Sequence, residues 1–426
     1  MAVRITRQPN KLALIGAPTS AAAHQPGLER APEALRAAGL VEKLTALGFE
    51  VTDLGDCPVK TFQQDDEHPR ARNAAAVVAM IDALKPKVEQ ATKSGTLPVI
   101  LGGDCAIALG TIAGVRRYFR NVSLVWTDSD ADLNVPATTP SGRLDGMVVA
   151  HIIGRGAPEV VRFWGEPPLV RPTEIQLFGY ARLDPPEEEL LNQLPIRRHP
   201  ADHVLRKGAA VAAQAAMEHI RTGQPFVLHF DVDALAQEDF SACNFPGTGG
   251  LRVADIRAAL EVFVGHPECG AFEISEYNPE KDADGSGARL LVDLIAAALA
   301  ARFHALVTAP AEAAARAAAE KEAEAPTAEA PAAEARAPES ESSDSAVVAE
   351  STQESAEPAA PPVAEAVAAS DEPTEETAVA PLEEQPDSGQ EPSAPVDTEL
   401  QAEEPSAEES PAEEPPAEEP KPSPES

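Results

Sequence analysis

The sequence VSLVWTDSDAD, residues 122–132, gives the clearest indication of how this chain folds. Its apolar run predicts a strand buried on both faces, as in parallel sheets that are covered by helices. Asp128, Asp130 and Asp132 follow the run directly. The stretch PFVLHFDVD, residues 225–233, repeats this arrangement with Asp231 and Asp233. Because ligands bind at the carboxyl ends of such strands, the two acidic clusters mark a candidate site.

Short apolar runs alternate with longer amphipathic stretches over about the first 305 residues. Further strands are predicted by LALIGAP (12–18), TLPVILGGD (96–104), EIQLFGY (174–180) and AFEISEYNP (271–279), and the segments between them have helical patterns. This alternation predicts a three-layer αβα fold around a mostly parallel sheet.

The composition changes sharply at about residue 309, after which Ala, Glu, Pro, Ser and Thr dominate and no aromatic residue occurs. About 32 acidic and 4 basic residues lie there, so about −28 of the formal charge of −36 belongs to this part. Such a segment buries too little apolar surface to fold. We therefore expect a folded domain over 1–308 and a disordered acidic tail over 309–426, which would repel nucleic acid and attract basic surfaces.

The cysteine pattern and the amino-terminal residues favour a cytoplasmic protein without disulfides. The four cysteines are far apart with no CxxC pair, and the chain starts without an apolar leader (Cys57, Cys105, Cys243 and Cys269). The most apolar helical stretch, residues 290–306, contains Asp293 and Arg302 and is short for a bilayer. We expect no membrane span.

Each Asp-x-Asp cluster taken singly is more often a solvated loop or a helix cap than a ligand site. Two clusters at the ends of two buried strands would repel one another strongly unless a cation lay between them. The pair therefore favours a divalent metal site.

Four motifs give the chain a specific resemblance. GGDC (102–105), DSDAD (128–132), HFDVD (229–233) and EYNP (276–279) are similar, in the same order, to the GGDH, DAHAD, SFDVD and EVNP segments of arginases and agmatinases. Connecting segments such as IGAPTS, TPSGRLDGM and FGYARLDPPE are also similar. Over about residues 10–305 the chain resembles the arginase/agmatinase/formiminoglutamase (ureohydrolase) superfamily.

The resemblance implies an arginase-like fold that binds two divalent metal ions, usually Mn²⁺. One ion would be bound by Cys105, Asp128, Asp132 and Asp231, and the other by Asp128, Asp130, Asp231 and Asp233. Metal-activated water would attack the carbon of a small guanidino or amidine-like substrate, and Glu276 would pair with the cationic group of that substrate. Homo-oligomers are common in the superfamily.

Three positions depart from the family pattern, since Cys105, Asp130 and Asp145 stand where typical members have histidine. The ligand set changes from about −4 to about −6 against +4, which makes water harder to deprotonate. A thiolate would favour zinc or iron, whereas Asp130 favours manganese or magnesium, so a single or mixed metal site remains an alternative. Cys105 could instead be a small buried neutral thiol.

Asp145 matches a proposed proton shuttle of the family. A carboxyl group that keeps its proton beside anionic neighbours could act as a general acid. The alternative is an acidic residue at the start of a helix, which the helix dipole favours.

The resemblance also implies substrate contacts (Asn134, Ser141, Arg143 and Asp184). Arg143 could clamp a carboxylate or balance the crowded acids. His229 either approaches the metal site or is a buried core histidine.

Two functions follow from these patterns. The favoured one is a metal-dependent hydrolase of linear carbon–nitrogen bonds, because five acids at metal positions are costly without a cation. The alternative is a catalytically degenerate protein of the same fold that binds a ligand or partner, and the three missing histidines support it.

Overall fold

Eight strands form one parallel sheet in the computed structural model, which describes residues 5–247 and 249–324. Their order in the sheet is β2-β1-β3-β8-β7-β4-β5-β6, and every neighbouring pair is parallel. The strands are β1 (Lys11–Ala17), β2 (Glu50–Asp56), β3 (Leu97–Gly102), β4 (Ser123–Thr127), β5 (Ile175–Phe178), β6 (Arg197–His199), β7 (Phe226–Asp231) and β8 (Cys269–Ser275). The predicted parallel sheet is confirmed.

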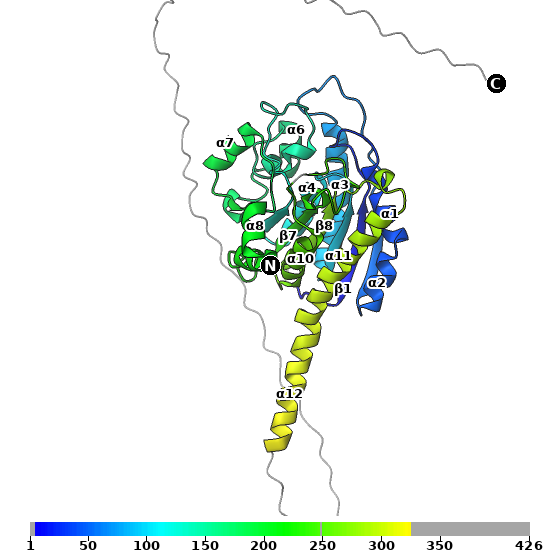
Figure 1. The fold of residues 1–426 in the computed structure, drawn as a ribbon, viewed down its shortest axis with the longest axis vertical. Helices are drawn as coiled ribbons and strands as arrows, with labels where there is room; N and C mark the ends of the chain where they lie inside the picture. Colours follow the sequence, from blue (N-terminus) through cyan, green and yellow to red (C-terminus); the bar gives the residue numbers. More distant parts are fainter. Residues whose placement is uncertain (1–4, 248, 325–426) are drawn as a thin grey trace, which may run out of the picture. The chain divides into compact units, whose positions relative to one another are not determined.

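Helices cover both faces of the sheet (Figure 1). One face carries α1 (Ala31–Ala37), α2 (Leu40–Ala46), α8 (Ala201–Lys207), α9 (Ala209–Met217), α10 (Val253–Gly265) and α11 (Ser286–Phe303). The other carries α3 (Ala74–Lys93), α4 (Ile107–Arg116), α5 (Val148–Ile152), α6 (Pro158–Val161) and α7 (Pro185–Gln193). Short 3-10 turns connect several of these elements, among them η2 (Asp145–Met147) and η5 (Val232–Ala234). This is the three-layer αβα fold expected from the sequence.

The residues of β7 are apolar on both faces of the sheet, which explains the central position of this strand. Phe226, Leu228 and Phe230 point into the core under α10 and α11, whereas Val227 points into the core under α3 and α4. Each side chain is fully buried, which contributes about 1.5–3 kcal/mol per large apolar residue. A strand that is apolar on both faces is stable only in the interior of a sheet.

The carboxyl ends of five neighbouring strands meet at one edge of the sheet. Thr127 of β4 pairs with Phe230 of β7, and Asp231 pairs with Ser275 of β8. Residues that follow β3, β8, β7, β4 and β5 therefore lie side by side although they are far apart in the sequence. The acidic clusters of the sequence occupy this edge.

The GGDC loop after β3 is held tightly against the loop after β1. A Cβ atom on Gly103 would lie 1.8 Å from the backbone oxygen of Thr19, so only glycine fits there. Asp104 accepts hydrogen bonds of 3.0 Å from the Ala22 N–H and the Thr19 hydroxyl. Burial raises the pKa of Asp104 to about 6. These contacts fix the position of the next residue, Cys105.

The end of the domain differs from the sequence expectation. Helix α11 continues through a π-helical turn, η7 (His304–Thr308), into α12 (Ala309–Glu324), so residues 309–324 of the predicted tail are helical. The helix Ser286–Ala318 has 33 residues and is long and apolar enough to cross a membrane by length and composition, so the expectation that it is too short was wrong. Leu291, Ile295 and Leu299 are nevertheless fully buried in the core, which accounts for the apolar character. The predicted disorder of 325–426 falls outside the described residues.

Candidate active site

A cavity of about 330 Å³ opens at the carboxyl edge of the sheet. Eleven of the twelve site residues expected from the sequence line it: Cys105, Asp128, Asp130, Asp132, Asn134, Arg143, Asp145, Asp184, Asp231, Asp233 and Glu276. The exception is Ser141. Residues that the sequence expectations did not include also line it: Gly146, Arg182, Leu183, Glu187 and Phe245. The structure thus brings the four motifs together in one site.

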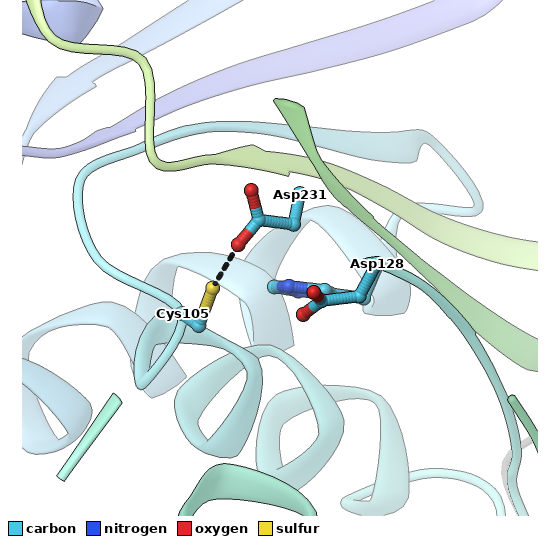
Figure 2. A group of neighbouring side chains, drawn as sticks. Cys105, Asp128 and Asp231 are labelled. Carbon is cyan, nitrogen blue, oxygen red and sulfur yellow. Dashed lines mark hydrogen bonds between the residues drawn. The ribbon is translucent and has the colours of Figure 1, made fainter. Parts of the chain in front are cut away.

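One group of ligand atoms surrounds Cys105, at the start of the segment that leads into α4. Its thiol donates a hydrogen bond of 2.9 Å to Asp231, and Figure 2 shows the Asp128 carboxylate beside this pair. Cys105, Asp128, His229 and Asp231 each offer an atom within 4.8 Å of the others, and all four residues are buried. We call this group the thiol half of the site.

The Asp-x-Asp spacing reflects a hydrogen bond that the first aspartate of each cluster accepts from the backbone N–H of the second. Asp128 accepts a 2.7 Å hydrogen bond from the Asp130 N–H, and Asp231 accepts one of the same length from the Asp233 N–H. Each first aspartate therefore forms a turn with the backbone two residues on. The Trp126 indole N–H donates to the other oxygen of Asp128 at 2.9 Å. The neutral donors orient both carboxylates without balancing their charge.

His229 is both a core residue and a neighbour of the thiol half. Its ring stacks on Trp126 with 3.6 Å between centroids and 4° between planes. Nδ1 lies 2.8 Å from a carboxylate oxygen of Glu273, and Nε2 lies 3.1 Å from the Ser275 hydroxyl. The Ser275 hydroxyl in turn lies 3.3 Å from the Cys105 sulfur. A carboxylate on one ring nitrogen is the usual way to orient a histidine whose other nitrogen serves a site.

A second group of ligand atoms comes from Asp128, Asp130 and Asp233, again within 4.8 Å of one another. In this second group an arginine side chain of the chain itself already supplies a positive charge. The Arg182 guanidinium donates to both oxygens of Asp130, at 3.0 and 2.6 Å, and to Asp233 at 2.7 Å. We call Asp130, Asp233 and Arg182 the arginine half. The sequence expectations did not include Arg182; its signal was its place after a buried strand, in the motif FGYARLDPPE.

The acids of the site hold protons more strongly than usual. Burial, followed by the charges of neighbouring acids, raises the pKa values of Asp128, Asp132 and Asp231 well above their ordinary values. Burial and Asp130 raise the pKa of Asp233 to about 6, although Arg182 opposes the shift. The cluster therefore lacks positive charge, most of all in the thiol half.

Backbone strain and an unpaired oxygen also mark the site. Asp132 and Glu276 have φ angles of 49° and 65°, and they are two of the three non-glycine residues with positive φ in the described part of the chain. Such conformations concentrate at functional sites. Oε1 of Glu276 is buried and has no hydrogen-bond partner in the part of the chain that the structure describes. An unpaired buried carboxylate oxygen beside a cavity fits a cationic group that binds there.

Asp145 lies both at the start of a helical turn and in the cavity, so the two interpretations drawn from the sequence are compatible. It begins η2 and accepts a 2.7 Å hydrogen bond from the Gly146 N–H, as an acid at a helix start does. It also lines the cavity, 3.7 Å from the Arg143 guanidinium. Burial raises the pKa of Asp145, while Arg143 lowers it by a smaller amount. The carboxyl group is therefore placed where it could exchange a proton with a ligand.

The expected substrate contacts divide into two sets. Asn134 donates a 2.9 Å hydrogen bond to Asp184 and accepts one of 3.0 Å from Thr138, so its polar atoms already have partners. Glu187, which the sequence analysis missed, accepts from the backbone N–H groups of Leu133 and Asp184 at 2.8 and 2.9 Å. Burial raises the pKa of Glu187 to about 7. This first set joins two loops at the rim.

Arg143 forms the second set with Ser141 and Phe245. The Ser141 hydroxyl accepts hydrogen bonds from the backbone N–H and Nε of Arg143 at 3.3 and 3.2 Å, so Ser141 supports the arginine from outside the cavity. The guanidinium carbon lies 4.1 Å from the centre of the Phe245 ring. Nη1 of Arg143 is buried and has no hydrogen-bond partner among residues 5–247 and 249–324.

The two halves differ in how well they fit a metal ion. The thiol half offers a sulfur, carboxylates and an imidazole, a donor set suited to a divalent transition metal. Its oxygens contact only neutral donors. In the arginine half the same carboxylate oxygens that would bind an ion contact Arg182. The thiol half therefore fits an ion, and the arginine half does so only without Arg182.

Comparisons with known proteins agree with the motifs and the fold. The Arginase family model matches residues 10–301. The arginase of Bacillus caldovelox is 30% identical over 289 residues, covering 67% of this chain and 96% of the relative. Human arginase-1 is 30% identical over 273 residues, covering 63% and 85%. The solved structure of the Bacillus caldovelox arginase superposes with a TM-score of 0.65 at 28% identity, covering 68% of this chain and 98% of that one. The chain therefore belongs to the arginase family.

Proposed function

We propose that this chain is a metal-dependent hydrolase of linear carbon–nitrogen bonds that acts on a small guanidino or related amidine-type substrate. The observation that carries the proposal is the thiol half. Its Cys105, Asp128 and Asp231, which have no cationic partner among the described residues, lie in the same cavity as Glu276, one of whose oxygens is also unpaired there. Its family relationship supports the same reaction class.

The metal would be bound by Cys105, Asp128 and Asp231, with His229 behind them. When bound, a divalent ion supplies the Lewis acidity that makes water nucleophilic near neutral pH. Manganese is the ion that the family resemblance implies. The sulfur of Cys105 also makes zinc or iron compatible with this half.

Two acids of the chain would handle the substrate. Oε1 of Glu276, which lacks a partner, would accept hydrogen bonds from the cationic guanidinium or amidine group. Asp145, whose pKa burial raises, would donate a proton to the nitrogen that leaves when the carbon–nitrogen bond breaks. The two acids line the same cavity, as a shared substrate requires.

The unpaired Nη1 of Arg143 supports a substrate with an anionic end. Phe245 and Ser141 hold the guanidinium in place, so it could bind a carboxylate at little cost in side-chain entropy. Asn134 and Asp184 already bind one another and would contribute mainly to the shape of the rim. We therefore favour guanidino acids over simple guanidino amines.

A catalytically degenerate binding protein is the second candidate. The observation in its favour is the arginine half, where a guanidinium from the chain itself lies on carboxylates that the family resemblance assigns to metal. Such a protein would bind a ligand without turning it over.

Hydrolysis assays separate the two candidates. The full chain is loaded with manganese, zinc or iron and is mixed with guanidino acids, guanidino amines and amidines, while the release of urea or ammonia is followed. We expect turnover that requires metal and that is lost in Asp128→Asn. Metal binding without turnover of any compound would favour the binding protein.

The cytoplasmic location and homo-oligomeric state remain predictions, and light scattering tests the oligomeric state.

A further inference from the structure

We propose that Arg182 is a built-in cation that takes the place of a second metal ion, so that the site holds a single divalent ion, in the thiol half. The inference rests on the proposed metal-dependent function. It assigns a role to Arg182, a residue of the segment FGYARLDPPE to which the sequence gave no role.

The guanidinium is held in a fixed geometry. Nε and Nη2 donate to the two oxygens of Asp130, at 3.0 and 2.6 Å, in the forked arrangement that arginine forms with carboxylates. Nη2 also donates to Asp233 at 2.7 Å, and Nη1 donates to the backbone oxygen of Phe245 at 3.2 Å. Three separate segments of the chain therefore fix one cation.

Arg182 and a metal ion would compete for the same atoms. Asp130 and Asp233 supply two of the three carboxylates in the second group of ligand atoms. Both oxygens of Asp130 and one oxygen of Asp233 accept from Arg182, and the other oxygen of Asp233 accepts from the Ser129 N–H at 3.3 Å. An ion on these oxygens would lie against the guanidinium, and the like charges would repel.

Charge balance points the same way. Arg182 leaves the arginine half with a formal charge of about −1. With Cys105 as the thiolate that binds a metal, a divalent ion would leave the thiol half, in which His229 is neutral, at about −1 as well. Adding an ion to the arginine half would make that half positive beside a cationic substrate. One ion and one guanidinium thus leave both halves mildly negative, which suits binding of a guanidinium or amidine group.

The pairing of Arg182 with Asp130 also accounts for a departure in the motif. Asp130 stands where the family resemblance expects a neutral histidine, so it adds a negative charge to the site. Arg182 contacts both of its oxygens and so removes the need for a metal to neutralise them. Together, the carboxylate of Asp130 and the guanidinium of Arg182 replace one of the two metal-binding positions.

Metal stoichiometry tests the inference on the full chain. The metal-free protein is titrated with MnCl₂, bound manganese per chain is measured by elemental mass spectrometry, and electron paramagnetic resonance distinguishes isolated from exchange-coupled Mn²⁺. We expect about one isolated ion in the natural chain and about two coupled ions in Arg182→Met, which keeps an unbranched side chain and removes the guanidinium and its charge. Arg206→Met on the exposed face of α8 is the matched control and should bind about one.

Other results of the manganese titration would overturn the inference or the proposed function. Two coupled ions in the natural chain, or one ion in a folded Arg182→Met variant, would overturn the role of Arg182 and leave the proposed function standing. Absence of bound manganese, zinc and iron from every form would overturn both. If circular dichroism shows that Arg182→Met does not fold, the titration of the natural chain tests the inference by itself. An exchange-coupled Mn²⁺ signal at about tenfold excess Mn²⁺ would refute the inference. One bound ion per chain without a coupled signal would support it.

Discussion

The thiol half and the arginine half start from the same sequence device, an Asp-x-Asp cluster after a buried strand, but differ in what meets their charge. In the thiol half all hydrogen bonds that Asp128 and Asp231 accept from described residues come from neutral groups. In the arginine half Asp130 and Asp233 share the guanidinium of Arg182. A metal-ligand motif therefore predicts a need for positive charge, and contacts with the surrounding chain determine whether a metal or an arginine supplies it.

Replacing the acid shared by both groups of ligand atoms should have the largest effect. In Asp128→Asn we expect the affinity for Mn²⁺ to fall at least about 100-fold, because a central charged ligand is lost. Isothermal titration calorimetry measures the affinity. Asp82→Asn, an exposed change on α3, should leave it unaltered. Unchanged affinity in Asp128→Asn would remove the thiol half as the metal site.

Asp145→Asn separates proton transfer from metal binding. We expect kcat to fall about 100-fold, because an amide cannot donate the proton, while the Mn²⁺ affinity stays within about twofold. The alkaline limb of the pH–rate profile should also disappear. A variant with normal kcat would show that Asp145 acts only as an acid at the start of η2.

Cys105→Ser sharpens the contrast by removing the sulfur from the thiol half. We expect the preference for Zn²⁺ over Mn²⁺ to fall about 10-fold, because a hydroxyl is a harder ligand than a thiolate. Competition between the two ions with a chromophoric chelator measures the preference. Cys269→Ser, a buried cysteine of β8, is the control and should not change the ratio.

The stability of the metal-free chain should fall as pH rises from about 4.5 to 7.5. Burial raises the pKa of Asp104 from 3.8 to about 6 and that of Glu187 from 4.5 to about 7. Burial also lowers the pKa values of His24, His151 and His199, which opposes this trend below about pH 6.5. Burial raises the pKa values of four further acids of the site well above their ordinary values, so the native state still binds more protons than the unfolded state across the window (Asp128, Asp132, Asp231 and Glu276). The stabilisation is lost as pH passes the raised values. We expect Tm to drop by about 5 °C in chelator-treated protein followed by circular dichroism. A Tm that rises over this range would contradict the charge assignment.

Much of the fold and of the acidic cluster could be predicted because the relevant signals are contiguous. In β4 and β7 an apolar run and the acids at its end are adjacent in sequence, and a parallel sheet brings such ends to one edge. The same logic placed Cys105 after β3 and Glu276 after β8.

The pairing of charges could not be predicted, since it depends on contacts between distant segments. Arg182 lies 52 positions from Asp130 and 51 from Asp233, and no spacing rule connects them. The sequence left two roles open for Arg143, to clamp a carboxylate or to balance the acids. The structure places it over Phe245 and 3.7 Å from Asp145, and pairs Asp130 and Asp233 with Arg182 instead. Ser141 was assigned to the substrate but lies behind Arg143, because a hydroxyl two residues away on a turn reaches the arginine more readily than the cavity.

Anomalous diffraction from a crystal of the full chain soaked in MnCl₂ would locate the bound ions. We expect one strong peak between Cys105, Asp128 and Asp231, with Arg182 still bound to Asp130 and Asp233. Two peaks with Arg182 displaced, or no peak among these residues, would contradict this expectation.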